Sequence, residues 1–188
     1  MEKQAEFYTG EGYLRKGKDV YSVLYMHIID LLPPPIKECP PIFDIGCGVG
    51  YFAERVMKRG YKKYVGLDFS EDMIRLASTL VPEYQYVLMS VYSDEFEVMV
   101  NNYRLFTMLE TLEHMDNDRE VLKKLPNGSI IVGSVPSSNA PGHVRTYKGV
   151  HDVFNRYNDI IEFNFLNEMY LNQKKPTNAL TVFRGVIK

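Results

Sequence analysis

A glycine-rich segment, DIGCGVG at residues 44–50, has the residue types of a ligand-binding loop. It follows a short apolar run and precedes apolar residues at helical spacing, so it connects a predicted strand to a predicted helix. Glycine allows a tight turn and a close approach of the backbone to a ligand, because it has no Cβ atom. A nicotinamide-binding loop would have its third glycine at position 51, where this chain has Tyr51. The pattern therefore predicts a loop for another ligand, or a plain turn.

Asp68 stands at the end of the next predicted strand, one helix after the glycine-rich loop. Both oxygens of a carboxylate accept hydrogen bonds, so an acid in this place can hold the two hydroxyls of a ribose. A helix-capping or solvent-exposed acid is the alternative. The loop before it and the sequence FSEDM after it, at residues 69–73, favour the ribose role.

Two acids and a histidine follow the fourth predicted strand, in the segment LETLEH at residues 109–114. Glu110, Glu113 and His114 have the donor atoms to hold a divalent cation, with His143 as a fourth ligand. The alternative is that Glu113 and His114 form local hydrogen bonds near the start of the next helix. We expect the local arrangement, and no bound metal.

Residues 134–147, SVPSSNAPGHVRTY, follow the fifth predicted strand and contain His143 and Arg145. An imidazole titrates near neutrality, so His143 is a candidate general base. The guanidinium of Arg145 is suited to a carboxylate or phosphate of a substrate. The alternative is that both side chains hold this loop to the protein's own backbone.

These segments need a scaffold in which strands alternate with helices. Apolar spacing predicts helices at residues 19–32, 50–59, 94–101, 116–125 and 146–157, and a further helix capped by Ser70. Strands are predicted at residues 42–45, 64–67, 84–89, 104–109, 129–135, 160–166 and 179–187. The alternation favours α/β architecture: a Rossmann-like, seven-stranded, mostly parallel sheet with helices on both faces and an antiparallel terminal hairpin.

The whole-chain composition fits one ligand-binding domain at residues 41–188, preceded by a segment with a helix at residues 1–40. A net charge of −2 gives no argument for a nucleic-acid or membrane partner. Cys39 and Cys47 lack a metal-binding spacing, and the N-terminal residues lack the apolar stretch of a secretion signal. We expect a cytoplasmic protein.

Residues 43–56 (FDIGCGVGYFAERV) and 64–77 (YVGLDFSEDMIRLA) resemble the first two cofactor motifs of class I S-adenosylmethionine-dependent methyltransferases. The similarity to the family pattern covers most of residues 41–137, and it implies S-adenosylmethionine as the cofactor. Many relatives contact the adenine edge with an acid and a small residue after the third strand. The aligned pair here is Ser90-Val91, a departure that leaves the backbone N–H of Val91 for this contact. The implied cofactor contacts are Asp44, Gly46, Cys47, Gly48, Gly50, Asp68, Phe69, Met73, Ser90, Val91 and Glu110.

The segment LETLEH resembles the E-x-x-E-H stretch of several methyltransferase subfamilies, including small-molecule O-methyltransferases of the ubiquinone-pathway type. A similar pattern, completed by a downstream histidine, supplies metal ligands in small-RNA 2′-O-methyltransferases. Residues 134–147 resemble the loop beside the substrate pocket of small class I members. The resemblance implies His143 and His114 as catalytic residues. It also implies Arg145, and Tyr13 in an N-terminal lid, as substrate contacts.

The sequence thus predicts methyl transfer from S-adenosylmethionine to an oxygen or nitrogen of a small molecule. A metal-dependent RNA 2′-O-methyltransferase and a non-catalytic cofactor-binding subunit are the alternatives. The near-neutral charge and the lack of an aromatic-basic RNA surface count against the first of these. The acceptor, the choice between oxygen and nitrogen, and the oligomeric state are left open by the sequence.

Overall fold

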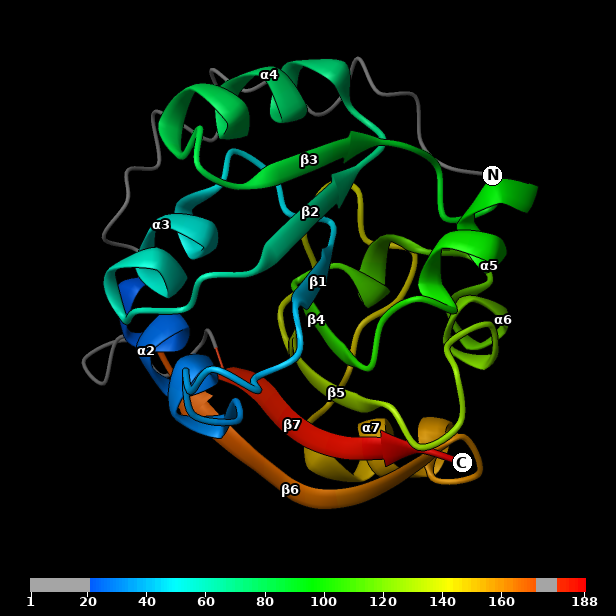
Figure 1. Cartoon of the computed structure of the whole chain (residues 1–188). Helices are drawn as coiled ribbons and strands as arrows, with labels where there is room; N and C mark the ends of the chain where they lie inside the picture. Colours follow the sequence, from blue (N-terminus) through cyan, green and yellow to red (C-terminus); the bar gives the residue numbers. More distant parts are fainter. Residues whose placement is uncertain (1–20, 172–178) are drawn as a thin grey trace.

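A mixed sheet organises the computed structural model, which describes residues 21–171 and 179–188 (Figure 1). The strand order in that part of the chain is β3-β2-β1-β4-β5-β7-β6. Strands β3 to β5 are parallel to their neighbours, whereas β7 is antiparallel to both β5 and β6. The predicted seven-stranded fold with its antiparallel terminal hairpin is therefore confirmed. The strands are β1 (Ile42–Ile45), β2 (Tyr64–Asp68), β3 (Gln85–Leu88), β4 (Leu105–Leu109), β5 (Ile130–Pro136), β6 (Ile161–Tyr170) and β7 (Ala179–Ile187).

Helices cover both faces of this sheet, as Figure 1 shows. Helices α2, α3 and α4 lie over one face, and α5, α6 and α7 lie over the other. The first three are α2 (Ser22–Leu31), α3 (Tyr51–Lys58) and α4 (Glu71–Leu80). The other three are α5 (Asp94–Val100), α6 (Asp118–Lys123) and α7 (Val150–Tyr157).

Two apolar clusters form the core, one on each face of the sheet. Ile42 of β1 packs in a cluster with Leu24 of α2 and Phe52 of α3. The next residue, Phe43, belongs to the other cluster, with Phe96 of α5. Neighbouring residues of a strand point to opposite faces, so a strand covered on both sides must be apolar at successive positions. This requirement explains the short apolar runs that predicted the central strands.

The carboxyl ends of the parallel strands meet at one edge of the sheet. The strands β1 and β4 are neighbours, and the connections that follow them lead to helices on opposite faces of the sheet. The strand order therefore reverses between β1 and β4, and ligands of open α/β sheets bind next to such a reversal, at the carboxyl ends of the strands. The glycine-rich loop, Asp68 and Glu110 follow or end β1, β2 and β4, so all three lie at this edge.

The main differences from the sequence prediction are the start of α7, a short extra helix after β4 and the end of β6. The last helix begins at Val150 and not at residue 146, because Gly149 has a φ of +117°, outside the helical range. A Cβ atom on Gly149 would also lie 2.2 Å from Glu168 Oε1 of β6. A short 3₁₀ helix, η2 (Leu112–His114), follows β4 and was not predicted. Strand β6 continues to Tyr170, beyond the predicted end at residue 166.

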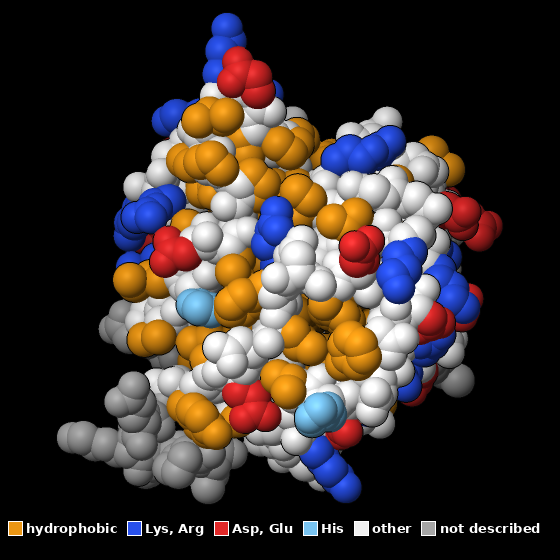
Figure 2. Space-filling view, turned by 90° about the horizontal axis from the view of Figure 1, so that it is seen from below, with side chains coloured by type: hydrophobic (Ala, Val, Ile, Leu, Met, Phe, Trp, Pro, Cys, Tyr) orange, Lys and Arg blue, Asp and Glu red, His pale blue; other side chains and the backbone are white. Residues whose placement is uncertain are grey.

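Strand β6 forms the far edge of the sheet, and Figure 2 views the molecule from that side. Apolar side chains lie there among scattered charged ones (Figure 2). Exposed apolar residues of the neighbouring elements include Met26 of α2, Phe154 of α7 and Tyr170 of β6. Within the described residues, no helix has the length and apolar character needed to cross a membrane.

Candidate functional site

The glycine-rich loop has the left-handed backbone that only glycine adopts easily. Gly46, Gly48 and Gly50 have φ angles of +80°, +54° and +84°. A Cβ atom on Gly46 would lie 2.7 Å from the Thr111 side chain, and one on Gly50 would lie 3.0 Å from Ala77 Cα. A Cβ atom on Gly48 would meet no described residue within 4 Å. Packing therefore accounts for the first and third glycines, whereas the described residues leave open space at Gly48.

Asp68 is bonded directly to this loop. Its Oδ2 accepts the backbone N–H of Gly48 at 3.0 Å, and its Oδ1 accepts that of Ser70 at 3.0 Å. The N–H groups of Gly46 and Cys47 donate to the carbonyl of Leu67, so the loop is also tied to the end of β2. Each carboxylate oxygen has more than one lone pair, so these bonds leave Asp68 chemically able to accept ligand hydroxyls. We call residues 46–50 and 68–70 the first loop pair.

Asp44 lies beneath this loop, inside the sheet. It is 2% exposed, and its carboxylate accepts hydrogen bonds from Tyr64 Oη at 2.5 Å and Thr107 Oγ1 at 2.6 Å. Burial raises the pKa of Asp44 to about 6, although both hydroxyls oppose the shift. The three side chains join β1 to both neighbouring strands. Asp44, which the resemblance implies as a cofactor contact, therefore also braces the sheet.

The other predicted cofactor residues flank the first loop pair. Cys47 is buried, and its sulfur occupies the space above Gly66, where a Cβ atom would lie 2.8 Å away. Only the backbone of Cys47 is therefore placed to line a ligand. Phe69 is half-buried, and Met73 is buried on α4 behind the N-cap residue Ser70. After β3, Ser90 Oγ accepts the N–H of Tyr92, and the side chain of Val91 packs in the core.

Glu110 ends β4 with a strained backbone. Its φ of +53° is the only positive value among the non-glycine residues that the structure describes. Its N–H donates to the carbonyl of Ser134, and its Oε1 accepts Ser134 Oγ at 2.8 Å. Burial raises the pKa of Glu110 to about 7, against the effect of the Ser134 hydroxyl. Strain of this kind concentrates at functional sites, and here it directs Glu110 toward β5.

Glu113, His114 and His143 form a cluster beyond Glu110. One potential ligand atom from each of the three lies within 4.8 Å of the other two. The His114 and His143 rings meet edge to face with centroids 4.8 Å apart. Glu113 is 1% exposed, and neither of its carboxyl oxygens takes part in a hydrogen bond with the described residues. Burial and the neighbouring Glu110 raise the pKa of Glu113 well above its ordinary value.

Residues 110–117 and 137–149, which we call the second loop pair, are held together by long-range bonds. His114 Nδ1 donates to the carbonyl of Gly142 at 3.1 Å, and the N–H of Val144 donates to the carbonyl of Glu113 at 2.8 Å. The guanidinium of Arg145 donates to the carbonyls of Leu112, Met115 and Asp116. The structure therefore shows Arg145 bonded to the protein's own backbone, and its predicted contact with substrate stays a prediction.

Asp118 forms a buried ion pair with Arg145. Its buried carboxylate lies 3.0 Å from Arg145 Nη1 and accepts two hydrogen bonds from the Arg156 guanidinium. Tyr157 also donates to it. One buried carboxylate thus balances two guanidinium groups, and it connects the second loop pair to α6 and α7.

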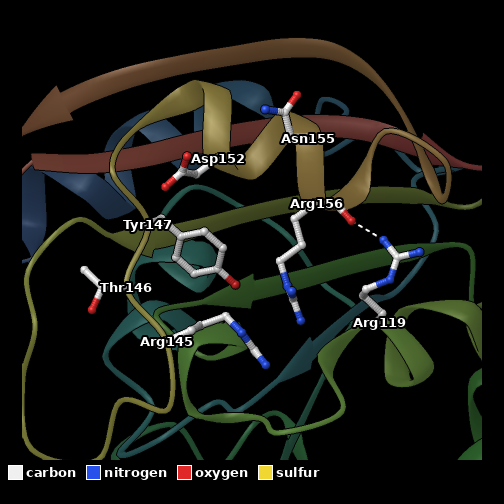
Figure 3. Close-up of a pocket in the computed structure, with 7 residues that line it drawn as sticks. All are labelled: Arg119, Arg145, Thr146, Tyr147, Asp152, Asn155 and Arg156. Atoms are coloured by element: carbon white, nitrogen blue, oxygen red, sulfur yellow. Dashed lines mark hydrogen bonds between the residues drawn. The ribbon is translucent and has the colours of Figure 1, made fainter.

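A hollow of about 530 Å³ opens on the outer side of this network (Figure 3). Its arginines are engaged in the protein: Arg119 with Asp159, and Arg156 with Asp118. Arg145, with its carbonyl partners, completes this wall. The charged side chains that line the hollow are thus already bonded to other groups of the protein. The open space at Gly48 is a better candidate for a ligand site.

The part of the chain that forms the first loop pair matches a known family. A family model described as a methyltransferase domain matches residues 42–127, which run from β1 through the loop after α6. This range contains the glycine-rich loop, Asp68 and the acids after β4. Over this range, which is a little under half of the chain, the protein is similar to methyltransferase domains. The prediction of S-adenosylmethionine as the cofactor agrees with this match.

One curated relative of this chain is the mitochondrial ubiquinone biosynthesis O-methyltransferase of Dictyostelium discoideum. The two are 25% identical over 111 residues, which are 50% of this chain and 35% of the relative. The chain thus spans about a third of the length of that relative.

Solved structures share the fold at low identity. A putative methyltransferase from Haloferax volcanii, in complex with the Trm112 activator, has a TM-score of 0.76. It is 13% identical, and the match covers 99% of this chain and 98% of that one. The N-methyltransferase NodS from Bradyrhizobium japonicum, in complex with S-adenosylhomocysteine, has a TM-score of 0.64 and 13% identity. That match covers 89% of this chain and 87% of NodS.

The structure brings most of the predicted site residues of this chain to one edge of the sheet. Tyr13 lies outside the described residues, so its substrate contact and the proposed lid stay predictions. Sequence reasoning missed Thr111, which abuts Gly46, and Ser134, which holds Glu110. It also missed the role of Asp118. Ser134 and Asp118 act on residues far away in the chain, so local spacing carried no signal for them.

Proposed function

We propose that this chain transfers the methyl group of S-adenosylmethionine to an oxygen or nitrogen of a small molecule. The observation that carries the proposal is the direct bond between the glycine-rich loop and Asp68 beside open space at Gly48. The match of residues 42–127 to a methyltransferase domain supports S-adenosylmethionine as the methyl donor, and the proposal extends this to the activity of the chain.

The cofactor would lie across the first loop pair. In this proposal the methionine portion passes over Gly46, Gly48 and Gly50, and the ribose hydroxyls bind Asp68. Phe69 and Met73 flank the adenine, and the N–H of Val91 meets its edge beside Ser90. Glu110 would face the cofactor from the end of β4. This direction of binding leads the methyl group toward the second loop pair.

The acceptor would bind at the second loop pair, beside His114 and His143. The sulfonium makes the methyl group reactive, so the protein's main task is to align donor and acceptor and to exclude water. His143 Nδ1 donates to the Ser138 carbonyl at 3.0 Å, which places the ring's lone pair on Nε2 in the neutral form. In the metal-free chain, Nε2 accepts the proton of an oxygen acceptor. A nitrogen acceptor needs no such base.

A small molecule is the acceptor class that the comparisons favour. The Dictyostelium relative is an O-methyltransferase of ubiquinone biosynthesis, and NodS is an N-methyltransferase, so both acceptor atoms have support. The net charge of −2 argues against an RNA acceptor. A cytoplasmic setting is part of the proposal and rests on the sequence alone.

Product formation tests the proposal. The chain is incubated with labelled S-adenosylmethionine and a fractionated extract of small metabolites, and transfer of label to an extract component is measured. We expect transfer with the wild-type chain and at least about tenfold less with Asp68→Ala, which loses hydrogen bonds to the ribose. Cofactor binding without transfer to any fraction would favour the non-catalytic subunit. Transfer only to an added RNA fraction would favour the RNA alternative.

A further inference from the structure

We propose that Glu113, His114 and His143 bind a divalent transition-metal ion. These residues come from η2 and from the loop after β5, and their potential ligand atoms lie within 4.8 Å of one another. His114 Nε2 is 3.7 Å from Glu113 Oε1. The site differs from the one implied by sequence resemblance, which would include Glu110.

Both imidazoles are oriented for coordination. A backbone carbonyl only accepts hydrogen bonds, so Nδ1 must carry the proton where it meets one. His114 Nδ1 meets the carbonyl of Gly142, and His143 Nδ1 meets that of Ser138. In the neutral rings, the lone pair is therefore on Nε2 of both residues. A carbonyl that fixes the far nitrogen is the usual support of a metal-binding histidine.

The Glu113 carboxyl group supplies the second, independent observation. It is 1% exposed, and neither oxygen makes a hydrogen bond with any described residue. A buried carboxyl group without hydrogen bonds is costly, because it has lost its hydration. A cation at the histidines would satisfy these oxygens.

Glu110 lies outside the site because another residue holds it. Its Oε1 accepts Ser134 Oγ at 2.8 Å, and its positive φ turns it toward β5. Reaching the ion would require breaking this bond. The ligand set is therefore two imidazole nitrogens and one carboxylate.

This donor set selects the class of ion. Magnesium and calcium prefer oxygen ligands, whereas imidazole suits zinc, cobalt, nickel and iron. Atoms bound at about 2.1 Å from one ion lie at most about 4.2 Å apart, so the half-buried imidazoles would move inward slightly. Three protein ligands leave at least one position open, as in catalytic metal sites.

The use of the ion rests on the proposed function, but its binding does not. At the open position, a bound ion would hold the acceptor oxygen and lower the pKa of its hydroxyl, so that the proton passes to solvent water. The ionised oxygen would then take the methyl group, and S-adenosylhomocysteine would leave. In the ion-loaded chain His143 is then a ligand, and the base of the metal-free chain is not needed. Ion binding and cofactor binding are measured separately, so either can fail alone.

Titration of the chelator-treated full chain with Co²⁺ and with Zn²⁺ tests the inference. Visible absorption reports the Co²⁺ ligands, and calorimetry reports Zn²⁺ affinity and stoichiometry. We expect one ion per chain, and at least about tenfold weaker binding in Glu113→Gln and in His143→Ala, the scale of losing metal-site groups. His151→Ala, an exposed histidine on α7, is the matched control and should bind as the wild type does.

Three results would overturn the inference. The first is no binding to the folded wild-type chain. The second is an equal affinity for the ion in the wild type and in Glu113→Gln. Glutamate and glutamine have nearly the same shape, so both proteins should fold. The third is an equal loss in Glu110→Gln, because Glu110 would then be a ligand. If S-adenosylmethionine binds and the ions do not, only this inference fails, and the proposed function stands.

Discussion

The two loop pairs meet at the same edge of the sheet, but they are built in different ways. The first pair is shaped by backbone: three left-handed glycines, and N–H groups that donate to Asp68 and Leu67. The second pair is shaped by side chains that reach across the fold, above all Arg145 and Asp118. Backbone geometry suits a constant ligand such as a cofactor. Side-chain bracing is easier to vary, which suits a part of the site that contacts an acceptor.

Loss of His143 is expected to give the largest effect and to separate the two pairs by function. His143→Ala should lower turnover about 10²–10⁴-fold for an oxygen acceptor, whether the imidazole accepts a proton or holds an ion. Cofactor affinity should stay within about twofold, because no bond of His143 reaches the first loop pair in the described structure. Steady-state kinetics and cofactor titration measure both quantities. Equal losses in turnover and in cofactor affinity would contradict the separation of the two loop pairs by function.

Removal of Asp118 should be the next largest effect, and it should act on stability. Asp118→Ala leaves Arg145 and Arg156 without their buried partner, at a cost of about 3–5 kcal/mol of unfolding free energy. Urea unfolding measures this loss. In the surviving folded chain, acceptor KM should rise while cofactor affinity is unchanged. A stability within about 0.5 kcal/mol of wild type would show that the network does not brace the second pair.

Alanine at two glycines can sharpen the account of the first pair. Gly48 and Gly128 both have positive φ angles and open space where a Cβ atom would lie. Each substitution should therefore cost about 1–2 kcal/mol of stability through backbone strain alone. Only Gly48→Ala should also weaken binding of S-adenosylmethionine, by about tenfold or more, because its methyl group enters the ligand's space. Equal cofactor affinity in the two variants would show that the cofactor does not bind next to Gly48.

The smallest expected effect concerns the pH dependence of stability through Asp44. Burial raises the pKa of folded Asp44 to about 6, above its ordinary value of 3.8. At a pH between these two values, the folded chain therefore holds a proton that the unfolded chain has lost. The contribution of Asp44 to the unfolding free energy should therefore fall, by on the order of 2 kcal/mol, as pH rises from about 4 to 6. Urea unfolding of wild type and Asp44→Asn across this range measures the contribution. The same pH slope in both would assign it to another group.

The difference between the loop pairs also explains what the sequence could predict. The glycines and Asp68 stand next to strand ends, so their positions followed from local spacing and strand order. The ring contact of His114 with His143 depends on η2 and on the path of residues 137–149, neither of which has a periodic signal. Glu110 was predicted to contact the cofactor from its motif, but its bond to Ser134 depends on the pairing of β4 with β5. The start predicted for α7 was too early, because the φ angle of Gly149 is outside the helical range.

Calorimetric titration of S-adenosylmethionine and S-adenosylhomocysteine into the wild-type chain and Asp68→Ala tests the central claim most directly. The account predicts one cofactor per wild-type chain, and binding weaker by about 1–3 kcal/mol in Asp68→Ala, which loses hydrogen bonds between a charged group and the ribose. Thermal unfolding of both proteins confirms that each is folded at the titration temperature. Failure of either ligand to bind the folded wild-type chain, or equal affinity in Asp68→Ala, would contradict the account.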